Sequence, residues 1–382
     1  MPDHPASPSR LARLEARGIS RRDFLEVCAI AAGTVGLPAT ALGAVEKAAG
    51  GSARPSVVWL HFQECTGCTE SLLRTSHPAI GEILLDLISL DYHETLLAAA
   101  GHQAEAVLDA TLTREAGKFV CIVEGAVPLA AGGQFCKIGD RTALELLNKV
   151  AEKAAAVIAI GSCASFGGIA AAEPNPTGAT GVPAVLRDRK VLTLPGCPTN
   201  PYNLLGVLLQ YATFGTLPAL DALGRPLFAF ARTIHEDCPR RSHFDAGRFA
   251  QKFGDAAHRA GHCLYKLGCK GPQTHANCSL LHFCDVVGAW PIGIGHPCVG
   301  CSEPAVAFRV PMHTTVGIDR PTPPATYPSV FADHGQAASP VATAVAGAIG
   351  GGLIGAALVA DRRLRREEKV ADEGRDHEGG ER

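Results

Sequence analysis

Short apolar runs alternate with segments of helical periodicity between residues 53 and 215. Runs of this kind are typical of parallel strands covered on both faces, and the helical segments between them are the usual crossover connections. The pattern therefore predicts an α/β domain with a parallel sheet over residues 53–215. The expected strands are residues 57–62, 119–123, 156–160 and 191–194, with a weaker one at residues 87–92.

A long uncharged run follows near the C-terminal end, at residues 341–360. As a helix it would be about 30 Å long, which matches the hydrocarbon core of a bilayer. Arg362, Arg363, Arg365 and Arg366 come next, and excess positive charge marks the cytoplasmic side of a membrane. We therefore expect a Pro-rich linker over 316–340, one transmembrane helix over 341–360 and a cytoplasmic tail over 361–382.

The N-terminal end has the pattern of an export signal. Arg21 and Arg22 precede Phe24-Leu25 and an uncharged, Ala- and Gly-rich run over 27–45, which is the arrangement of a twin-arginine signal. We predict such a signal over residues 1–50, recognised by the twin-arginine export machinery. The predicted export signal and the predicted transmembrane helix agree on one location. Both indicate that the domains between them lie on the periplasmic face of the bacterial cytoplasmic membrane, anchored by the C-terminal helix.

Charge and cysteine content narrow the class of protein. Charged residues make up 19% of 382 residues and the formal net charge is −2, whereas nucleic-acid-binding domains are usually basic. We therefore expect no nucleic-acid partner. Fourteen cysteines are many for a cytosolic enzyme and few, over this length, for a small disulfide scaffold, so their spacing has to identify their role.

Four cysteines follow the ends of predicted strands. Ligands of an open α/β sheet collect beyond the carboxyl ends of its strands, so these thiols are expected to converge. Four thiolates suit either tetrahedral zinc or an iron–sulfur cube, and a single Cys-x-x-Cys joined by two distant cysteines favours the cube. Disulfides are the alternative for an exported chain. The set comprises Cys65, Cys68, Cys163 and Cys197.

A second cysteine-rich segment spans residues 235–301, where hydrophobic periodicity fades. Bound metal can replace core burial as the energy that organises such a segment. One group there combines an imidazole with three thiols, namely His235, Cys238, Cys263 and Cys269; a lone histidine is usually a core residue, but Cys238 three positions away favours a ligand. The other group has three thiols, namely Cys278, Cys298 and Cys301.

Five motifs together give the chain a specific resemblance. They are Glu64-Cys65-Thr66-Gly67-Cys68-Thr69-Glu70, Gly161-Ser162-Cys163-Ala164-Ser165-Phe166-Gly167-Gly168, Pro195-Gly196-Cys197-Pro198, Ile234-His235-Glu236-Asp237-Cys238-Pro239-Arg240-Arg241 and Gly295-His296-Pro297-Cys298-Val299-Gly300-Cys301. With these motifs over residues 57–303, the chain resembles the small subunit of a membrane-bound, uptake-type nickel-iron hydrogenase.

The resemblance implies a fold and a set of cofactors. It implies a flavodoxin-like domain over 53–215 with a proximal 4Fe-4S cluster on Cys65, Cys68, Cys163 and Cys197. A largely irregular iron–sulfur domain over 216–315 would hold two more clusters: a distal 4Fe-4S cluster on His235, Cys238, Cys263 and Cys269, and a medial 3Fe-4S cluster on Cys278, Cys298 and Cys301.

The resemblance also implies an activity and partners. The nickel-iron centre would lie on a separate large subunit, so no catalytic residue is expected in this chain. The chain would relay electrons from hydrogen oxidation to an integral membrane cytochrome b or a related quinone-linked subunit. Glu64 is expected at the large-subunit interface or on a proton path, with a structural hydrogen-bond role as the alternative.

Several positions refine this picture. Gly67 and Gly168 stand where the oxygen-tolerant branch of the family carries additional cysteines, which implies an ordinary proximal cube and oxygen sensitivity. Cys284 is interpreted as an unused thiol, with a fourth medial ligand as the alternative. Cys121 and Cys136 have no motif and are expected to behave as small buried hydrophobes.

Two competing functions stay open at this stage. The first motif alone also resembles the corresponding subunit of respiratory complex I, which makes another redox complex the second hypothesis. An exported structural protein held by disulfides or zinc is the third.

Overall fold

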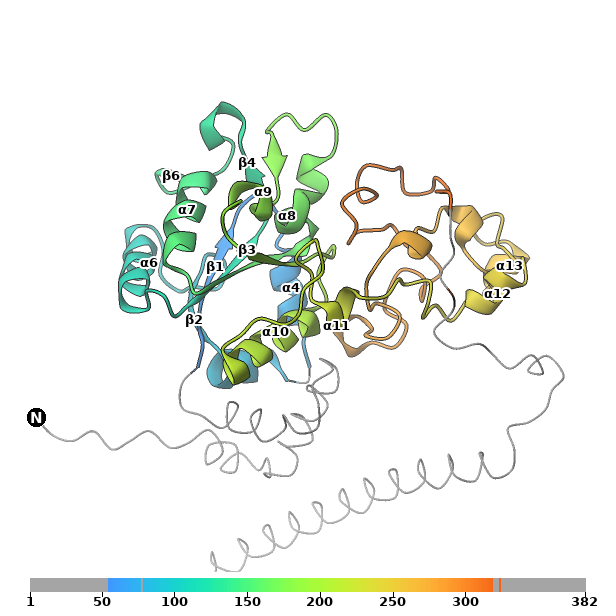
Figure 1. The fold of residues 1–382 in the computed structure, drawn as a ribbon, viewed down its shortest axis with the longest axis horizontal. Helices are drawn as coiled ribbons and strands as arrows, with labels where there is room; N and C mark the ends of the chain where they lie inside the picture. The colour runs from blue at the N-terminus through green and yellow to red at the C-terminus, as the bar shows by residue number, and fades with distance from the viewer. Residues whose placement is uncertain (1–53, 77, 319–322, 324–382) are drawn as a thin grey trace, which may run out of the picture. The chain divides into compact units, whose positions relative to one another are not determined.

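The computed structural model describes residues 54–76, 78–318 and 323 (Figure 1). Contacts divide the chain into residues 1–325 and 326–382, and every described residue belongs to the first unit. The predicted export signal, transmembrane helix and tail lie outside the described residues. Within the described residues, no helix is long and apolar enough to cross a membrane.

Five parallel strands form the central sheet, in the order β2-β1-β3-β7-β9. All five predicted strands are present, with boundaries shifted by at most two residues. The order reverses between β1 and β3, and a crevice for ligands forms beyond the carboxyl ends of the strands at such a point. The strands are β1 (Ser56–His61), β2 (Ser89–His93), β3 (Val120–Glu124), β7 (Ala156–Ile160) and β9 (Val191–Leu194).

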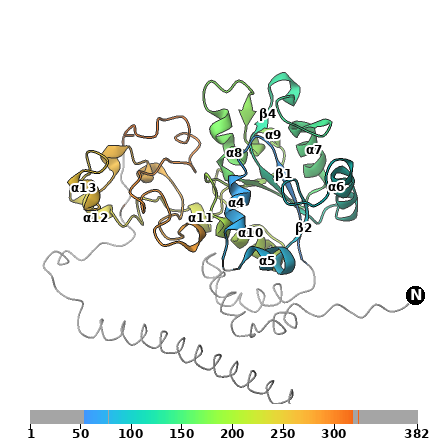
Figure 2. The same cartoon turned by 180° about the vertical axis from the view of Figure 1, so that it is seen from behind.

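Helices cover both faces of this sheet because successive strand residues point to opposite sides. Val58 and Leu60 of β1 pack toward α6 (His102–Arg114) and α7 (Ala143–Lys153). Trp59 packs in the second core, toward α4 (Gly67–Leu73) and α10 (Pro201–Phe214). Figure 2 shows the two helix layers from behind. Burial of each large apolar side chain contributes about 1.5–3 kcal/mol, so the sheet gives the strand ends a rigid support.

Shorter elements connect this framework. They are α5 (Ile80–Glu82), the π-helix η2 (Ile83–Leu87), β4 (Val127–Pro128), η3 (Ala130–Gly133), β5 (Lys137–Ile138), β6 (Arg141–Thr142), α8 (Gly161–Phe166), η4 (Gly168–Ala171), β8 (Ala179–Thr180) and α9 (Val182–Val185).

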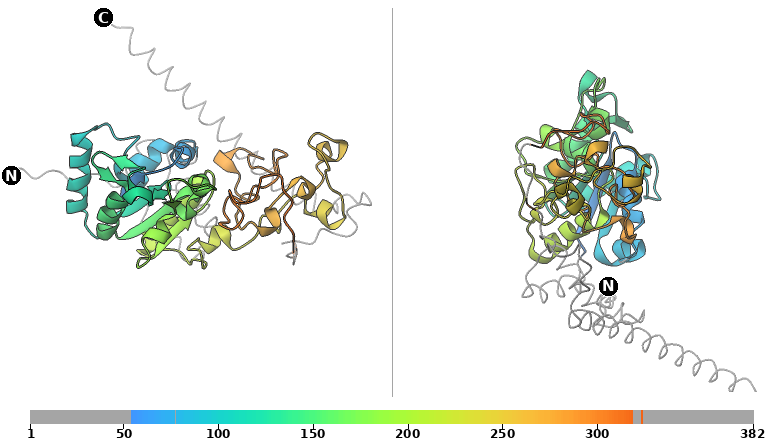
Figure 3. Two further views of the ribbon diagram at one scale, coloured as in Figure 1. Left: turned by 90° about the horizontal axis from the view of Figure 1, so that it is seen from above. Right: turned by 90° about the vertical axis from the view of Figure 1, so that its right-hand side faces the viewer.

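Beyond α10 the described chain consists of short helices, turns and loops, as Figure 3 shows in yellow and orange. The helices are α11 (Leu227–Phe230), α12 (Arg241–Asp245), α13 (Ala256–Arg259), η5 (Tyr265–Leu267), η6 (Gly271–Gln273) and η7 (Phe283–Asp285). This irregular region has a small core of its own, in which Leu264, Trp290 and Ile292 pack with Cys269 and Cys298. Two predicted ligands therefore also serve as core residues.

Candidate metal centres

The turn between β1 and α4 carries Cys65 and Cys68. Thr66 adopts a left-handed conformation (φ 61°) between them. The buried Glu124 carboxylate, at the carboxyl end of β3, accepts hydrogen bonds from the backbone N–H of Cys68 at 2.9 Å and of Thr69 at 3.1 Å. The same carboxylate also accepts hydrogen bonds from the Thr69 hydroxyl at 2.6 Å and from the Trp59 indole N–H at 3.2 Å. The strand end thus fixes the turn.

Cys163 and Cys197 come from the next two strand ends. Cys163 lies in α8, directly after β7, and Cys197 follows β9. The two loops are joined at Ser162, whose N–H donates to Gly196 O at 2.9 Å and whose hydroxyl accepts the Gly196 N–H at 3.1 Å. Adjacent parallel strands thus bring these cysteines to the same edge as Cys65 and Cys68.

The four thiols of this proximal set interact with one another. Burial raises the pKa of Cys68 above its usual range, with further contributions from Glu124, Cys163 and Cys197. Burial also raises the pKa of Cys163 to about 11, and the neighbouring Cys197 and Cys65 add to the shift. Such thiols are protonated at neutral pH in the absence of metal, so ligation would displace protons.

Glycines leave space beside these sulfur atoms. A Cβ at Gly161 would lie 2.6 Å from Cys68 Sγ, and one at Gly168 would lie 2.8 Å from Cys163 Sγ. A Cβ at Gly67 would come within 3.1 Å of Cys65 Sγ. The proximal set therefore fits a bulky group that needs close backbone approach.

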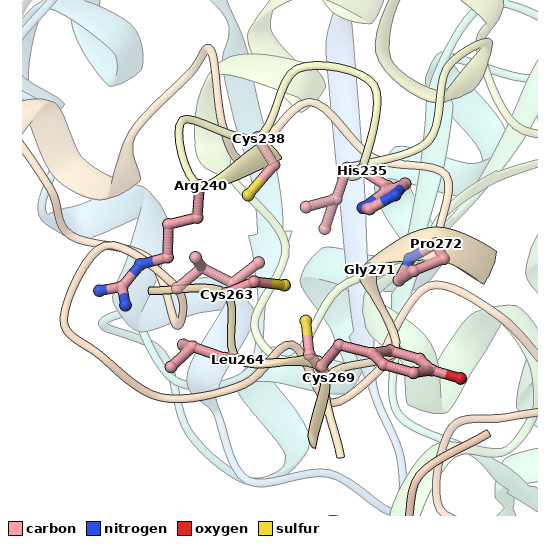
Figure 4. A pocket seen from close by; sticks show the side chains of 11 residues that line it. His235, Cys238, Arg240, Cys263, Leu264, Cys269, Gly271 and Pro272 are labelled. Carbon is pink, nitrogen blue, oxygen red and sulfur yellow. The ribbon is translucent and has the colours of Figure 1, made fainter. Parts of the chain in front are cut away.

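One pocket is lined by the distal set, which comprises His235, Cys238, Cys263 and Cys269. Figure 4 shows the three sulfur atoms turned toward the centre of the pocket. His235 is buried, and its Nε2 has no hydrogen-bond partner. Burial and the Arg241 charge lower the His235 pKa to about 4, so the ring is neutral and can ligate. An orphaned buried nitrogen beside three thiols fits a metal cluster.

Cys278, Cys298 and Cys301 form the medial set. Burial raises the pKa of Cys278 to about 11, and burial together with Cys278 raises that of Cys301 to about 12. The Cys298 thiol is buried beside Cys269, Cys301 and Cys278, and its pKa also lies above the usual range. Three mutually interacting thiols are thus present.

Direct contacts connect the three sets. The Ser162 hydroxyl, beside Cys163, donates to Cys301 O at 2.6 Å. The Cys298 N–H donates to Cys269 Sγ at 3.4 Å, which joins the medial and distal sets. The medial set therefore lies between the other two.

None of the thirteen cysteines among the described residues forms a disulfide, so the disulfide alternative finds no support there. Within the same residues, no three His, Cys, Asp or Glu side chains are placed to share a single metal ion. In an iron–sulfur cluster each thiolate binds a different iron atom.

The remaining predicted residues have mixed surroundings. Glu64 accepts from the Thr66 hydroxyl at 3.2 Å and lies 3.3 Å from His61 Nδ1, but its Oε2 is buried without a partner. Cys121 is buried in the sheet core, as expected, whereas Cys136 is only half-buried against it. Cys284 adopts a left-handed conformation (φ 52°) in η7.

Sequence reasoning missed Glu124, which holds the Cys65–Cys68 turn. The available signal was a single acidic residue directly after the apolar run at 119–123.

Comparison with known proteins identifies the family. Residues 65–211 match the family described as NADH ubiquinone oxidoreductase, 20 Kd subunit, and residues 230–313 match the C-terminal family of NiFe/NiFeSe hydrogenase small subunits. The first match agrees with the complex I resemblance of the first motif, and the second distinguishes the chain as a hydrogenase subunit.

Relatives cover most of the chain. The Hydrogenase-2 small chain of Escherichia coli is 46% identical over 93% of this chain and 96% of its own length. Periplasmic [NiFe] hydrogenase small subunit 1 of Nitratidesulfovibrio vulgaris is 50% identical over 76% and 92%. The Quinone-reactive Ni/Fe-hydrogenase small chain of Wolinella succinogenes is 46% identical over 76% and 82%.

A solved structure agrees with the sequence comparisons. The reduced, active Ni-Fe-Se hydrogenase from Desulfomicrobium baculatum matches with a TM-score of 0.65 and 36% identity, over 69% of this chain and all of the matched one. The chain therefore belongs to the small subunits of nickel-iron hydrogenases and serves as an electron-transfer subunit.

Proposed function

We propose that the chain holds three iron–sulfur clusters in a row: a proximal 4Fe-4S cluster, a medial 3Fe-4S cluster and a distal 4Fe-4S cluster, on the three sets defined above. The observation that carries this proposal is the contact of the medial set with both others, at Ser162–Cys301 and Cys298–Cys269. When bound, such clusters transfer single electrons.

The side chains of this chain orient and enclose that row. Glu124 and Ser162 fix the proximal turns, and Phe244 packs edge-on against the His235 ring with centroids 4.5 Å apart. A fixed ring orientation is what a histidine ligand needs. Of the medial thiols, Cys298 is buried, and Cys278 and Cys301 are partly buried, between the sheet and the distal set.

The partners follow from the family. A large subunit holding the nickel-iron centre would cover the proximal end, with Glu64 near the interface, and an integral membrane cytochrome b or quinone-linked subunit would accept the electrons. The quinone-reactive relative of Wolinella succinogenes supports a quinone-linked acceptor.

Location and domain organisation complete the proposal. The periplasmic relative of Nitratidesulfovibrio vulgaris supports a periplasmic location. The strand order supports a flavodoxin-like domain over 53–215, followed by an iron–sulfur domain over 216–315. The signal over 1–50 and the anchor over 341–360 are proposed from their sequence patterns.

The test is anaerobic purification from the native host through a tag on this chain, followed by hydrogen-dependent reduction of a viologen dye and electron paramagnetic resonance (EPR) spectroscopy. Wild type should co-purify with a larger subunit, reduce the dye and show a 3Fe-4S signal when oxidised. Cys298→Ser should remove that signal, whereas the matched variant Cys121→Ser, at a buried thiol outside the three sets, should keep it. Retention of the signal in Cys298→Ser would contradict the assignment.

A further inference from the structure

Lys270 lies fully buried between two of the ligand sets. It is 1% exposed. It directly follows Cys269 of the distal set, and its backbone N–H donates to the carbonyl of Cys298 of the medial set at 2.9 Å. The backbone N–H of Cys298 in turn donates to Cys269 Sγ. The lysine backbone is thus part of the junction between the two sets.

The surroundings of the Lys270 side chain suit an ammonium. Nζ donates to the carbonyl oxygens of Gly268 at 3.4 Å, Pro311 at 3.0 Å and Met312 at 2.8 Å. An ammonium has three N–H donors and no acceptor, so three carbonyls satisfy all of them, whereas a neutral amine would turn its lone pair toward a carbonyl oxygen. The hydrogen bonds therefore favour the charged form.

This charge has no carboxylate partner among the residues that the structure describes. A buried charge without a counter-ion is costly. Cys269 and Cys298 are close enough for their thiolates, once a cluster binds, to attract the ammonium, and this attraction opposes the burial that lowers the Lys270 pKa. Bound clusters would add further negative charge at the same place.

We propose that Lys270 is a fixed positive charge shared by the distal and medial clusters, which raises both reduction potentials together. The inference rests on the proposed function, because it assumes that the two sets hold clusters. Reduction adds an electron, and a nearby cation stabilises the more negative state. Lys270 is therefore a positioning residue that acts on the reduction potentials of two successive clusters.

Arg240 provides an internal contrast. It lines the distal pocket, and its guanidinium donates to His262 O at 3.0 Å. Its charge acts on the distal thiols Cys238, Cys263 and Cys269. Removing the Arg240 charge should therefore shift the distal cluster alone, while removing the Lys270 charge should shift both clusters.

The experiment is a redox titration of the anaerobically purified hydrogenase complex, followed by EPR, for wild type, K270Q, K270M, K270R, R240Q and K252Q. Both Lys270 variants should shift the one-electron equilibrium of the medial and distal clusters about tenfold toward oxidation, or about 59 mV each, with the proximal cluster unchanged. R240Q should shift only the distal cluster. K252Q, at an exposed lysine, should shift none.

The outcomes distinguish failure of the cluster assignment from failure of the proposed role of the Lys270 charge. Absence of the medial and distal signals in wild type would overturn the cluster assignment itself. Normal signals with unchanged potentials in K270Q or K270M would overturn the charge proposal and leave a structural role. If both neutral variants failed to assemble while K270R assembled normally, the charge would be needed for folding rather than for tuning, which also overturns it.

Discussion

A small buried group of polar side chains lies beside the proximal set, around His61. Glu94 Oε2 accepts a hydrogen bond from the backbone N–H of His61 at 2.7 Å, and the His61 and His93 rings are in contact, with Nε2 atoms 3.4 Å apart. One oxygen each of Glu64 and Glu94 is buried without a partner. In Glu94 the unpaired buried oxygen destabilises the ionised carboxylate, because the charge loses its hydration without gaining a hydrogen bond in exchange.

Glu94 should therefore make stability depend on pH. Burial raises its pKa to about 7, from an ordinary value near 4.5. Between these values the folded state holds a proton that the unfolded state lacks, so folding stability falls as pH rises from about 4.5 to 7. Glu94→Gln removes this loss. Thermal unfolding should show the variant more stable than wild type by about 3 kcal/mol at pH 8, and no more stable near pH 4.5.

The control for this prediction is Glu152→Gln, at an exposed position of α7. It should follow the wild-type pH profile. An unchanged pH profile in Glu94→Gln as well would show that Glu94 is ionised in the folded protein throughout this range.

Cys284 offers a second test on a single residue. Its left-handed conformation is unfavourable for most residues, whereas Gly and Asn adopt it readily. Cys284→Asn should raise stability by about 0.5–1 kcal/mol in denaturant unfolding and leave the 3Fe-4S signal unchanged. Val286→Asn, a neighbour at φ −88°, should bring no gain. Conversion of the medial EPR signal in Cys284→Asn would instead identify Cys284 as a ligand.

At the scale of elements, continuous apolar runs were sufficient to predict all five strands. Their boundaries shifted for two reasons: the polar Glu124 completes β3, whereas the apolar Leu87 belongs to the π-helix that precedes β2. The small core around Trp290 and Ile292 was not predicted, since it forms from residues without helical or strand periodicity.

The ligands of the candidate site could be predicted because cysteine and histidine recur at characteristic spacings in the sequence. These spacings predicted the proximal, medial and distal sets. Glu124 and Lys270 were not identified, because each acts through contacts made only when distant segments fold together. A single buried charge carries no spacing signal.

The turn between β7 and α8 should tolerate no side chain at Gly161. Gly161 has φ +80° and faces Cys68 Sγ, whereas Gly117 has a similar φ of +73° and open space around it. Both Ala variants should lose about 1 kcal/mol of stability from the left-handed backbone. Only Gly161→Ala should also perturb the proximal cluster, detected by EPR and iron content. Equal cluster spectra in the two variants would show that the turn can relax.

At the scale of the whole molecule, the sheet and the irregular region depend on each other. The medial Cys301 is held by Ser162 from α8, and Asn200, the N-cap of α10, donates to Leu281 O at 3.0 Å. A row of clusters needs fixed separations, because electron transfer falls off with distance. The contacts between the two regions therefore matter as much as the ligands.

Within the irregular region, the buried Arg225 supports the segment that carries Cys301. It is 5% exposed and pairs with Asp221 at 2.7 Å and with Glu303 at 2.8 Å, two residues beyond Cys301. Arg225→Met would leave both carboxylates without their cation, which should cost about 3 kcal/mol at neutral pH. The medial 3Fe-4S signal should broaden or disappear first. Arg187→Met, at an exposed arginine, should change neither stability nor spectrum.

The loss in Arg225→Met should also depend on pH, with a defined sign. Burial alone would raise the pKa of Glu303, but hydrogen bonds from His275 and Arg225 outweigh it, so the net shift is downward from 4.5. A lowered pKa contributes stability above the ordinary value, which is lost as pH falls below it. The stability difference between wild type and Arg225→Met should therefore be full at pH 7 and shrink below about pH 4.5. A difference that stayed constant into acid would place the loss in packing against Phe230, whose ring lies 5.5 Å from the guanidinium, rather than in the ion pair.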